Sequence, residues 1–372
     1  MIALHVIFAG GGTGGHLYPG LAIARALVKL ESRVQPYFVG AARGVEREVL
    51  PQTEFPHSLL DLHPVYRSRP WQNWRTLRGA AMAWRAIELL GRTRRPRLVV
   101  GTGGYASGAA LGWAWTRGVP IVQHIGDSRP GVTASVFARV SRDCYLGFPE
   151  AEQLLPHRGC VFYDTGNPIE PPPDVRPRPA EARARWGFPT EARVLLVFGG
   201  SQGARAINQA VAAWLERGLP PKLCLIWATG TAQFDAFKQF DRADVRVVRY
   251  LSPIADAYAA ADLAFVRGGM MATSELCAWG VPMLICPLPT AAADHQTENA
   301  RSLERAGAAV HLPQSALTAQ HLDQAVRALM ADAARLGSLR RAAVGRARPH
   351  AAREIAALIL RRLHAEQRVE AL

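Results

Sequence analysis

Two glycine-rich turns stand directly before residues that could do chemistry. The turn Arg267-Gly268-Gly269 leads into a helix-like segment with Glu275 at its sixth position, and the run Gly10 to Gly15 leads into His16. Glycines let the backbone approach a ligand closely, and the start of a helix offers unpaired N–H groups to a phosphate. A carboxylate more than one turn into that helix can accept hydrogen bonds from the hydroxyls of a ribose. Residues 267–275 therefore predict a nucleoside-diphosphate site; the alternative is a solvated glutamate on an ordinary helix.

The first glycine turn has the spacing of a dinucleotide-binding loop. Gly10, Gly12 and Gly15 fit G-x-G-x-x-G. That fingerprint requires an acidic residue at the end of the next strand, but residues 40–43 contain no Asp or Glu. We therefore predict a phosphate cradle rather than an NAD site. His16 at the mouth of this loop is a candidate general base, and the alternative is a histidine that only makes structural hydrogen bonds.

Short apolar runs alternate with helical segments along both halves of the chain. Strands are expected at 4–9, 35–39, 98–100, 120–124, 193–198, 223–228, 245–251, 263–266 and 281–287. Such alternation predicts an α/β protein with two doubly wound, Rossmann-like parallel-sheet domains. Five prolines between residues 171 and 179 indicate a linker. The expected domains are 1–166 and 181–350, joined by a linker at 167–180, with the helix at 351–366 packing back on the first domain.

The composition narrows the possible partners and compartment. The 372 residues carry a formal net charge of +14, which suits a polyanionic partner. No zinc spacing, RNA-binding sheet motif or helix-turn-helix signature is present, so we expect no nucleic acid partner. The five widely spaced cysteines indicate free thiols of a cytosolic protein. The N-terminal residues lack the features of a signal peptide, and no apolar run reaches the ~18 residues of a membrane span.

The segment from 65 to 97 combines tryptophans with an unusual number of arginines. It holds nine arginines and one acidic residue. Its tryptophans recur at helical spacings, and arginines lie beside them. This pattern is typical of an interfacial helix on an anionic membrane; the alternative is a core-facing helix with a basic outer face. The predicted membrane patch comprises Trp71, Trp74, Trp84, Arg75, Arg78 and Arg85.

Six segments of the chain together resemble the MurG family of peptidoglycan glycosyltransferases. In order they are GGGTGGHLYPG, GTGGYASG, GNP, FGGSQGARAIN, RGGMMATSE and DHQTENA. The resemblance covers nearly the whole chain and implies the GT-B fold, with two Rossmann-like domains facing a cleft. It implies inverting transfer of N-acetylglucosamine from UDP-N-acetylglucosamine to lipid I, forming lipid II, by a peripheral enzyme at the cytoplasmic face of the inner membrane. The alternatives are a related enzyme with another acceptor, a UDP-sugar 2-epimerase, or a non-catalytic paralogue that binds UDP-sugars.

The resemblance also implies roles for individual residues. Glu275 would hold the uridine ribose and Gln296 would reach the donor sugar. Thr13, Gly14 and Gly15 would face the acceptor diphosphate, with His16 as the first choice of general base and Asp127 as the second. The expected donor-binding residues are Ser201, Gln202, Leu251, Met270, Met271, Ala272, Thr273, Ser274, Glu275 and Gln296. The chain contains no D-x-D cluster, so we expect neither a metal ion nor another cofactor.

Two segments depart from the pattern of that family. His124-Ile125-Gly126-Asp127 stands where the family usually has His-Glu-Gln-Asn, and Ile169-Glu170 stands where Val-Arg is typical. Loss of an arginine near a diphosphate removes a bidentate contact, and a glutamate there repels the phosphates. We therefore expect Asp127 and Glu170 to affect donor affinity, acceptor choice or activity.

Overall fold

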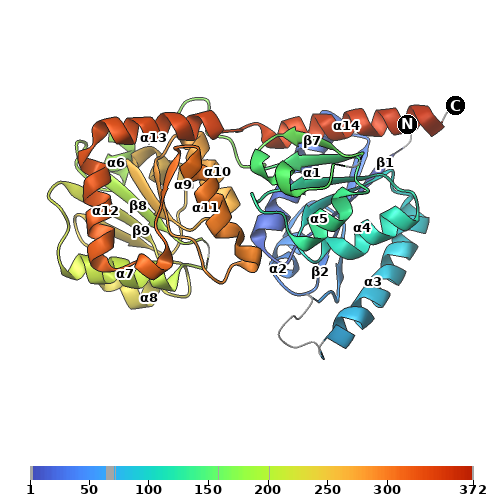
Figure 1. The fold of residues 1–372 in the computed structure, drawn as a ribbon, viewed down its shortest axis with the longest axis horizontal. Coiled ribbons are helices and arrows are strands. Elements are labelled where there is room, and N and C mark those ends of the chain that lie inside the picture. Colours follow the sequence, from blue (N-terminus) through green and yellow to red (C-terminus); the bar gives the residue numbers. More distant parts are fainter. Residues whose placement is uncertain (1–2, 64–70, 72, 158, 201, 371–372) are drawn as a thin grey trace. The chain divides into compact units, whose positions relative to one another are not determined.

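The chain forms two α/β units, each built on its own parallel sheet (Figure 1). The computed structural model describes all residues except 1–2, 64–70, 72, 158, 201 and 371–372. One unit comprises Met1–Ile169 together with His350–Leu372, and the other comprises Glu170–Pro349. The two parallel sheets confirm the fold class predicted from the alternation of strands and helices.

The first unit has a seven-stranded sheet in the order β3-β2-β1-β4-β5-β6-β7, with every neighbouring pair parallel. Its strands are β1 (Leu4–Gly10), β2 (Val34–Ala41), β3 (His57–Leu60), β4 (Leu98–Gly103), β5 (Ile121–Ile125), β6 (Asp143–Leu146) and β7 (Val161–Asp164). Its α-helices are α1 (Gly14–Leu30), α2 (Glu46–Val49), α3 (Asn73–Arg94), α4 (Ser107–Thr116), α5 (Val132–Ala138) and α14 (Ala351–Glu370).

Helices cover both faces of this sheet, which explains why its central strands are apolar throughout. Alternate residues of β1 point to opposite faces. Val6 and Phe8 pack with residues of α1 and α14, including Leu17 and Ile355, whereas Ile7 packs with residues of α3 and α4. The C-terminal helix α14 is therefore part of the core of the first unit.

The second unit has a six-stranded parallel sheet in the order β10-β9-β8-β11-β12-β13. Its strands are β8 (Arg193–Phe198), β9 (Leu223–Ala228), β10 (Val245–Val248), β11 (Leu263–Val266), β12 (Met283–Ile285) and β13 (Ala309–His311). Its α-helices are α6 (Pro179–Arg185), α7 (Arg205–Glu216), α8 (Phe234–Phe237), α9 (Ile254–Ala260), α10 (Met270–Trp279), α11 (His295–Arg305), α12 (Ala319–Ala331) and α13 (Ala333–Arg346).

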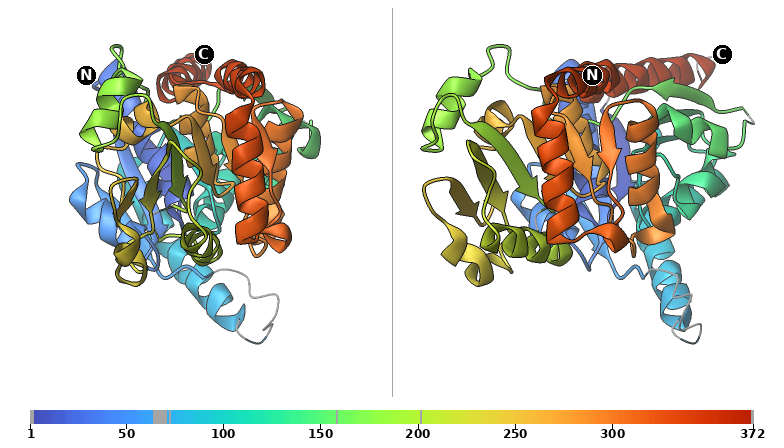
Figure 2. Two further views of the ribbon diagram at one scale, coloured as in Figure 1. Left: turned by 90° about the vertical axis from the view of Figure 1, so that its left-hand side faces the viewer. Right: turned by 60° about the vertical axis from the view of Figure 1, so that its left-hand side comes forward.

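Helices also lie on both faces of the second sheet (Figure 2). Leu195 and Val197 of β8 pack in one cluster with residues of α7, α12 and α13. Phe198, the next residue of the strand, turns to the other face, where its ring lies 6.2 Å from that of Tyr258 in α9. The loops that follow β8 and β11 therefore start from strands that are packed on both faces.

The first unit extends beyond residue 166. Asn167 and Ile169 are 1% and 3% exposed, and Nδ2 of Asn167 donates a hydrogen bond to the carbonyl oxygen of Gly126 at 3.1 Å. The start of the segment expected as a linker is thus buried in the first unit, because Asn167 closes the turn after β5. The run of prolines begins only after this boundary.

Candidate functional site

The first glycine turn joins β1 to α1. Gly11 and Gly12 have φ angles of +149° and +94°, which residues with a side chain rarely adopt. The helix begins at Gly14, and the side chain of its N-cap residue, Thr13, makes no capping hydrogen bond. The N–H of His16 donates to the carbonyl oxygen of Thr13 at 3.2 Å, which leaves the N–H groups of Gly14 and Gly15 to a ligand, and the helix dipole favours an anion there. This geometry agrees with the predicted phosphate cradle.

A buried carboxylate that sequence reasoning missed supports this turn from behind. Glu46, at the start of α2, is 0% exposed, and its Oε1 accepts a hydrogen bond from the N–H of Gly12 at 2.6 Å. Its Oε2 is buried and has no hydrogen-bond partner among the described residues. Glu46 lies 34 residues from Gly12, and no local pattern in the sequence connects the two. The loop is therefore held in shape by a distant acidic residue.

His16 lies against the glycine turn that follows β4. A Cβ atom at Gly103 would lie 2.7 Å from Nδ1 of His16, and one at Gly104 would lie 2.0 Å from the carbonyl oxygen of Gly11. Both positions have positive φ angles, so only glycine fits them without strain. The two turns interlock, and the second turn fixes the position of the half-buried His16 ring.

A second histidine lies behind His16. His124 of β5 is 1% exposed, and its pKa is lowered to about 3, first by burial and then by the charge of His16. Interactions with the side chain of Asn167 and the backbone of Gly166 act in the opposite direction. His124 is therefore neutral near pH 7. Its position inside the protein identifies it as a supporting group, because a ligand cannot reach it.

In the second unit, the turn Arg267-Gly268-Gly269 leads from β11 into α10. A Cβ atom at Gly268 would lie 2.4 Å from the carbonyl oxygen of Gln296, which shows that α11 presses its first turn against this loop. Nδ2 of Asn299 donates to the carbonyl oxygen of Gly268 at 3.0 Å. Oε1 of Gln296 accepts from the N–H of Leu288, which leaves the amide NH₂ of Gln296 as the group that can meet a ligand.

Glu275 is held in place by a tyrosine that sequence reasoning did not single out. The hydroxyl of Tyr258 in α9 donates to Oε2 of Glu275 at 2.6 Å, which leaves the other carboxylate oxygen for a ligand hydroxyl. Burial raises the pKa of Glu275, the hydrogen bond from Tyr258 lowers it, and the nearby charge of Glu170 raises it. A desolvated, oriented carboxylate is the arrangement expected of a residue that binds a ribose, and it disfavours the alternative of a solvated glutamate.

Arg267 adds a buried positive charge behind the same turn. Its side chain is 9% exposed, and Nη1 donates to the carbonyl oxygens of Cys286 and Pro287 at 2.9 and 3.0 Å. Burial lowers its pKa. Within the described residues no carboxylate pairs with this guanidinium. The turn is therefore backed by a cation, which favours a diphosphate at the start of α10.

Comparison with known proteins decides the family. Residues 6–146 match the model of the glycosyltransferase family 28 N-terminal domain, and residues 194–356 match that of the C-terminal domain. The chain belongs to glycosyltransferase family 28. Within it, the chain is 38% identical to "UDP-N-acetylglucosamine--N-acetylmuramyl-(pentapeptide) pyrophosphoryl-undecaprenol N-acetylglucosamine transferase" of Salinibacter ruber, over 96% of both chains. The resemblance to the MurG family is thereby confirmed.

Solved structures agree with this assignment to family 28. The crystal structure of MurG from Acinetobacter baumannii superposes with a TM-score of 0.76 at 26% identity, over 96% of this chain and 99% of that one. A putative UDP-N-acetylglucosamine 2-epimerase from Listeria monocytogenes has a TM-score of 0.66 at 14% identity, over 96% of each chain. The second likeness concerns the fold alone.

The predicted donor-binding run of this family 28 chain has two sides. Met270 and Thr273 are 5% and 0% exposed and face the core, so only their backbone can contact a ligand. The remaining four members of the run, Met271, Ala272, Ser274 and Glu275, are half-buried. Elsewhere, Leu251 is buried and Gln202 is exposed, and Ser201 lies outside the described residues. Their roles toward the donor stay predictions.

The departure at Asp127 leaves a half-buried carboxylate at the end of β5. Because β1, β4 and β5 are neighbours in the sheet, their carboxyl ends place His16, Gly103 and Asp127 along one edge of the first unit. His16 and Asp127 thus both remain candidates for the general base. The second departure, Glu170, is exposed and near enough to Glu275 to influence its pKa.

Five of the six residues of the predicted membrane patch belong to α3, which projects from the first unit (Figure 2), and Trp71 precedes this helix. Trp71 and Trp74 are 71% and 55% exposed. Trp84 is instead half-buried and packs against the core beneath α4. Ten residues of α-helix place it about 80° around the axis from Trp74, on the core side of the helix. Trp84 is therefore not part of the exposed patch.

Other side chains extend this patch along the helix. Arg78 and Arg85 are exposed as expected, and the side chain of Arg75 lies outside the described residues. Met82 and Leu89, which the sequence analysis did not name, are 54% and 65% exposed. Across the part of the chain that the structure describes, no helix has the length and apolar character that crossing a membrane requires.

Proposed function

We propose that this protein transfers N-acetylglucosamine from UDP-N-acetylglucosamine to lipid I, giving lipid II for peptidoglycan synthesis. The observation that carries the proposal is the match of both halves of the chain to the two domains of family 28, together with a relative of that name over 96% of its length. The Glu275–Tyr258 pair beside a cation-backed turn supports the proposal, because such an arrangement suits the ribose and the diphosphate of UDP.

The reaction is a single displacement at the anomeric carbon. The acceptor hydroxyl attacks, its proton passes to a base, and the bond to the UDP oxygen breaks with inversion. His16 is the first candidate for the base because the second glycine turn fixes its ring, and Asp127 is the second candidate. The departing diphosphate gains negative charge, which the N–H groups at the start of α10 and the guanidinium of Arg267 stabilise.

A transfer assay with defined substrates tests this proposal. Purified protein is incubated with radiolabelled UDP-N-acetylglucosamine and lipid I, and lipid-linked product is counted. We expect label in the lipid fraction only when lipid I is present. Release of free 2-epimerised sugar without acceptor would identify an epimerase instead. Binding of the donor without any turnover would identify a non-catalytic paralogue.

We further propose that the protein docks peripherally on the anionic cytoplasmic face of the inner membrane through α3. One exposed side of this helix, called here the α3 stripe, consists of Trp74, Arg78, Met82, Arg85 and Leu89. Their spacings of three and four residues place them on one face. Exposed apolar side chains beside arginines suit an anionic lipid surface. Five cysteines without disulfides suit the reducing cytosol.

Co-sedimentation with vesicles tests the docking. High salt should weaken binding to anionic vesicles, because the Debye length falls to about 3 Å at 1 M. The Trp71→Ser, Trp74→Ser double variant should bind less at any salt concentration, because it loses apolar area. Wild-type protein that ignores lipid charge, with a double variant that sediments equally well, would refute docking through α3.

A further inference from the structure

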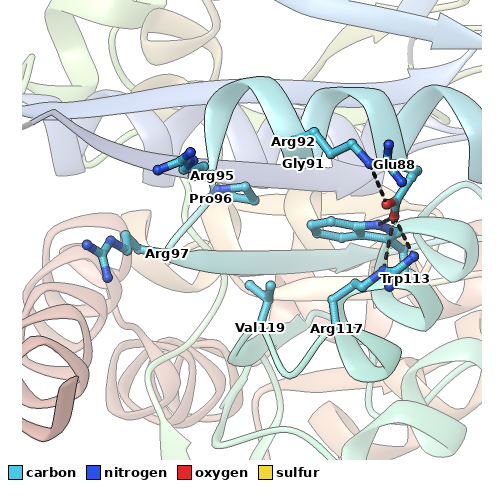
Figure 3. A pocket seen from close by; sticks show the side chains of 9 residues that line it. All are labelled: Glu88, Gly91, Arg92, Arg95, Pro96, Arg97, Trp113, Arg117 and Val119. Carbon is cyan, nitrogen blue, oxygen red and sulfur yellow. Dashed lines mark hydrogen bonds and ion pairs between the residues drawn. The ribbon is translucent and has the colours of Figure 1, made fainter.

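A basic surface pocket of about 430 Å³ lies where the C-terminal ends of α3 and α4 meet (Figure 3). No role assigned above uses this pocket. The charged residues that line it are Glu88, Arg92, Arg95, Arg97 and Arg117. Four guanidinium groups and one carboxylate leave a formal charge of +3 around a small volume. Such a concentration of arginines favours an anion with several oxygen acceptors.

One end of the pocket is ordered by Glu88. Its Oε1 accepts from Nε of Arg92 at 3.0 Å, and its Oε2 accepts from Nε of Arg117 at 3.0 Å and from the indole Nε1 of Trp113 at 2.8 Å. The carboxylate holds two guanidinium groups in fixed positions (Figure 3). Both side chains remain accessible, with 76% and 51% exposure. A ligand therefore meets oriented donors rather than mobile ones.

The other end is formed by Arg95 and Arg97, whose side chains lie away from Glu88 in Figure 3. Arg95 follows the last residue of α3 with a φ of +47°, a position where helices usually have glycine. Its N–H donates to the carbonyl oxygen of Gly91 at 2.9 Å and closes the helix. No carboxylate in the part of the chain that the structure describes pairs with the Arg95 guanidinium. A strained backbone that carries an uncompensated charge into a pocket indicates a functional site.

The wall of the pocket is apolar and tightly packed. The Trp113 ring is 4% exposed, and a Cβ atom at Gly91 would lie 2.1 Å from its Cζ2. Only glycine lets α3 approach the indole this closely. Pro96, which is buried, and Val119 complete the wall. The pocket thus offers apolar surface to the neutral part of a ligand and guanidinium groups to its anionic part.

We propose that this pocket binds the phosphodiester head group of an anionic phospholipid. The α3 stripe ends at Leu89, and Arg92, one turn further on the same face, lines the pocket. A lipid surface that covers the stripe brings phosphodiesters to the pocket, whereas a soluble phosphate lacks a neutral part to occupy the apolar wall. The proposal rests on docking through α3, and it adds a discrete, saturable site to a diffuse surface.

Short-chain lipid below its micelle concentration tests the pocket without a membrane. Full-length protein is titrated by calorimetry with dihexanoyl-phosphatidylglycerol, with dihexanoyl-phosphatidylcholine and with inorganic phosphate. We expect one saturable site for the phosphatidylglycerol and much weaker binding of the other two. The Arg95→Gly variant removes one guanidinium and relieves the positive φ, so it should fold well and bind about tenfold or more weakly.

Two further variants distinguish lipid binding in the pocket from a general effect of positive charge and from membrane docking. Arg139→Gln removes one exposed positive charge at the end of α5 and should bind the short-chain lipid like the wild type. Equal binding by the wild type and Arg95→Gly, or equal binding of phosphatidylcholine, would overturn the proposal. Inorganic phosphate that binds as tightly as the lipid would also overturn it, in favour of a general anion site. Trp74→Ser should reduce vesicle binding only, so failure of the docking proposal is visible separately.

Discussion

The sharpest test of the donor site is replacement of Glu275 by glutamine. The variant keeps the shape of the side chain and an oxygen that can accept from Tyr258, but it loses the charge. A hydrogen bond from a ribose hydroxyl to a carboxylate contributes about 1.5–3 kcal/mol. We therefore expect the dissociation constant of UDP-N-acetylglucosamine to rise roughly tenfold to 150-fold. Calorimetry with a folded variant measures this, and unchanged affinity would exclude the ribose role.

The same site predicts a pH dependence whose direction follows from the neighbours of Glu275. Burial and the charge of Glu170 raise its pKa, and the hydrogen bond from Tyr258 lowers it. Binding requires the ionised carboxylate, so donor affinity should fall as the pH drops through this raised pKa. Glu170→Gln removes a like charge and should move the fall to lower pH. Tyr258→Phe removes a stabilising donor and should move it to higher pH.

UDP-N-acetylglucosamine is the suitable titrant because its diphosphate does not titrate in this range. Glu275→Gln serves as the control and should show little pH dependence. Shifts of Glu170→Gln and Tyr258→Phe in the same direction would refute the electrostatic argument, even if Glu275 contacts the ligand. Glu170→Gln should also strengthen donor binding near neutral pH, because a charge that repels the diphosphate is gone.

Three further predictions concern the first unit and one concerns metal ions. His16→Ala should lower turnover by roughly 10²–10⁴-fold with donor binding nearly unchanged; near-normal turnover would move the role of base to another group. In the unfolded chain His124 binds a proton below about pH 6.5, whereas in the folded protein it stays neutral down to about pH 3. The free energy of unfolding should therefore decrease as the pH is lowered from 6.5 to 3. In urea unfolding, the free energy of unfolding of His124→Gln should depend on pH less steeply than that of the wild type, by about 1.4 kcal/mol per pH unit. An equal dependence in both proteins would contradict the buried neutral ring. The Sγ atoms of Cys144 and Cys160 lie 3.1 Å apart, so diamide should remove two titratable thiols from the wild type but none of that pair from Cys160→Ser. A chelator should leave transfer activity unchanged, and activity restored by added Mg²⁺ would contradict metal independence.

Local patterns in the sequence predicted the strands and turns that carry the site. The strand at 193–198 and the start of α10 at Met270 were located to the residue, because apolar runs and glycines mark these ends. The short strands β3, β6, β7 and β13 were missed. They have only three or four residues each, and β7 is partly exposed, so neither length nor hydrophobicity distinguishes them from loops.

The supporting residues could not be found from local patterns because they come from distant parts of the chain. Glu46 bonds to a residue 34 positions away, and Tyr258 reaches Glu275 from another helix. Tyrosine in an apolar helix predicts core packing as readily as a role beside a ligand. The assignment of Trp84 to the membrane patch failed for a different reason. Helical spacing shows which residues share a face, but only tertiary packing decides which face is covered.

The two glycine turns look alike in sequence but differ in what lies behind them. Glu46 supports the turn of the first unit and accepts the hydrogen bond from the N–H of Gly12, so this N–H is no longer available to a ligand. Arg267 supports the turn of the second unit through backbone carbonyls and leaves its charge uncompensated within the described residues. The second turn should therefore bind a diphosphate strongly without help, whereas the first should bind one weakly. That asymmetry suits the proposed reaction. A soluble donor needs affinity from its site alone, and an acceptor anchored in a lipid surface reaches its site at high local concentration.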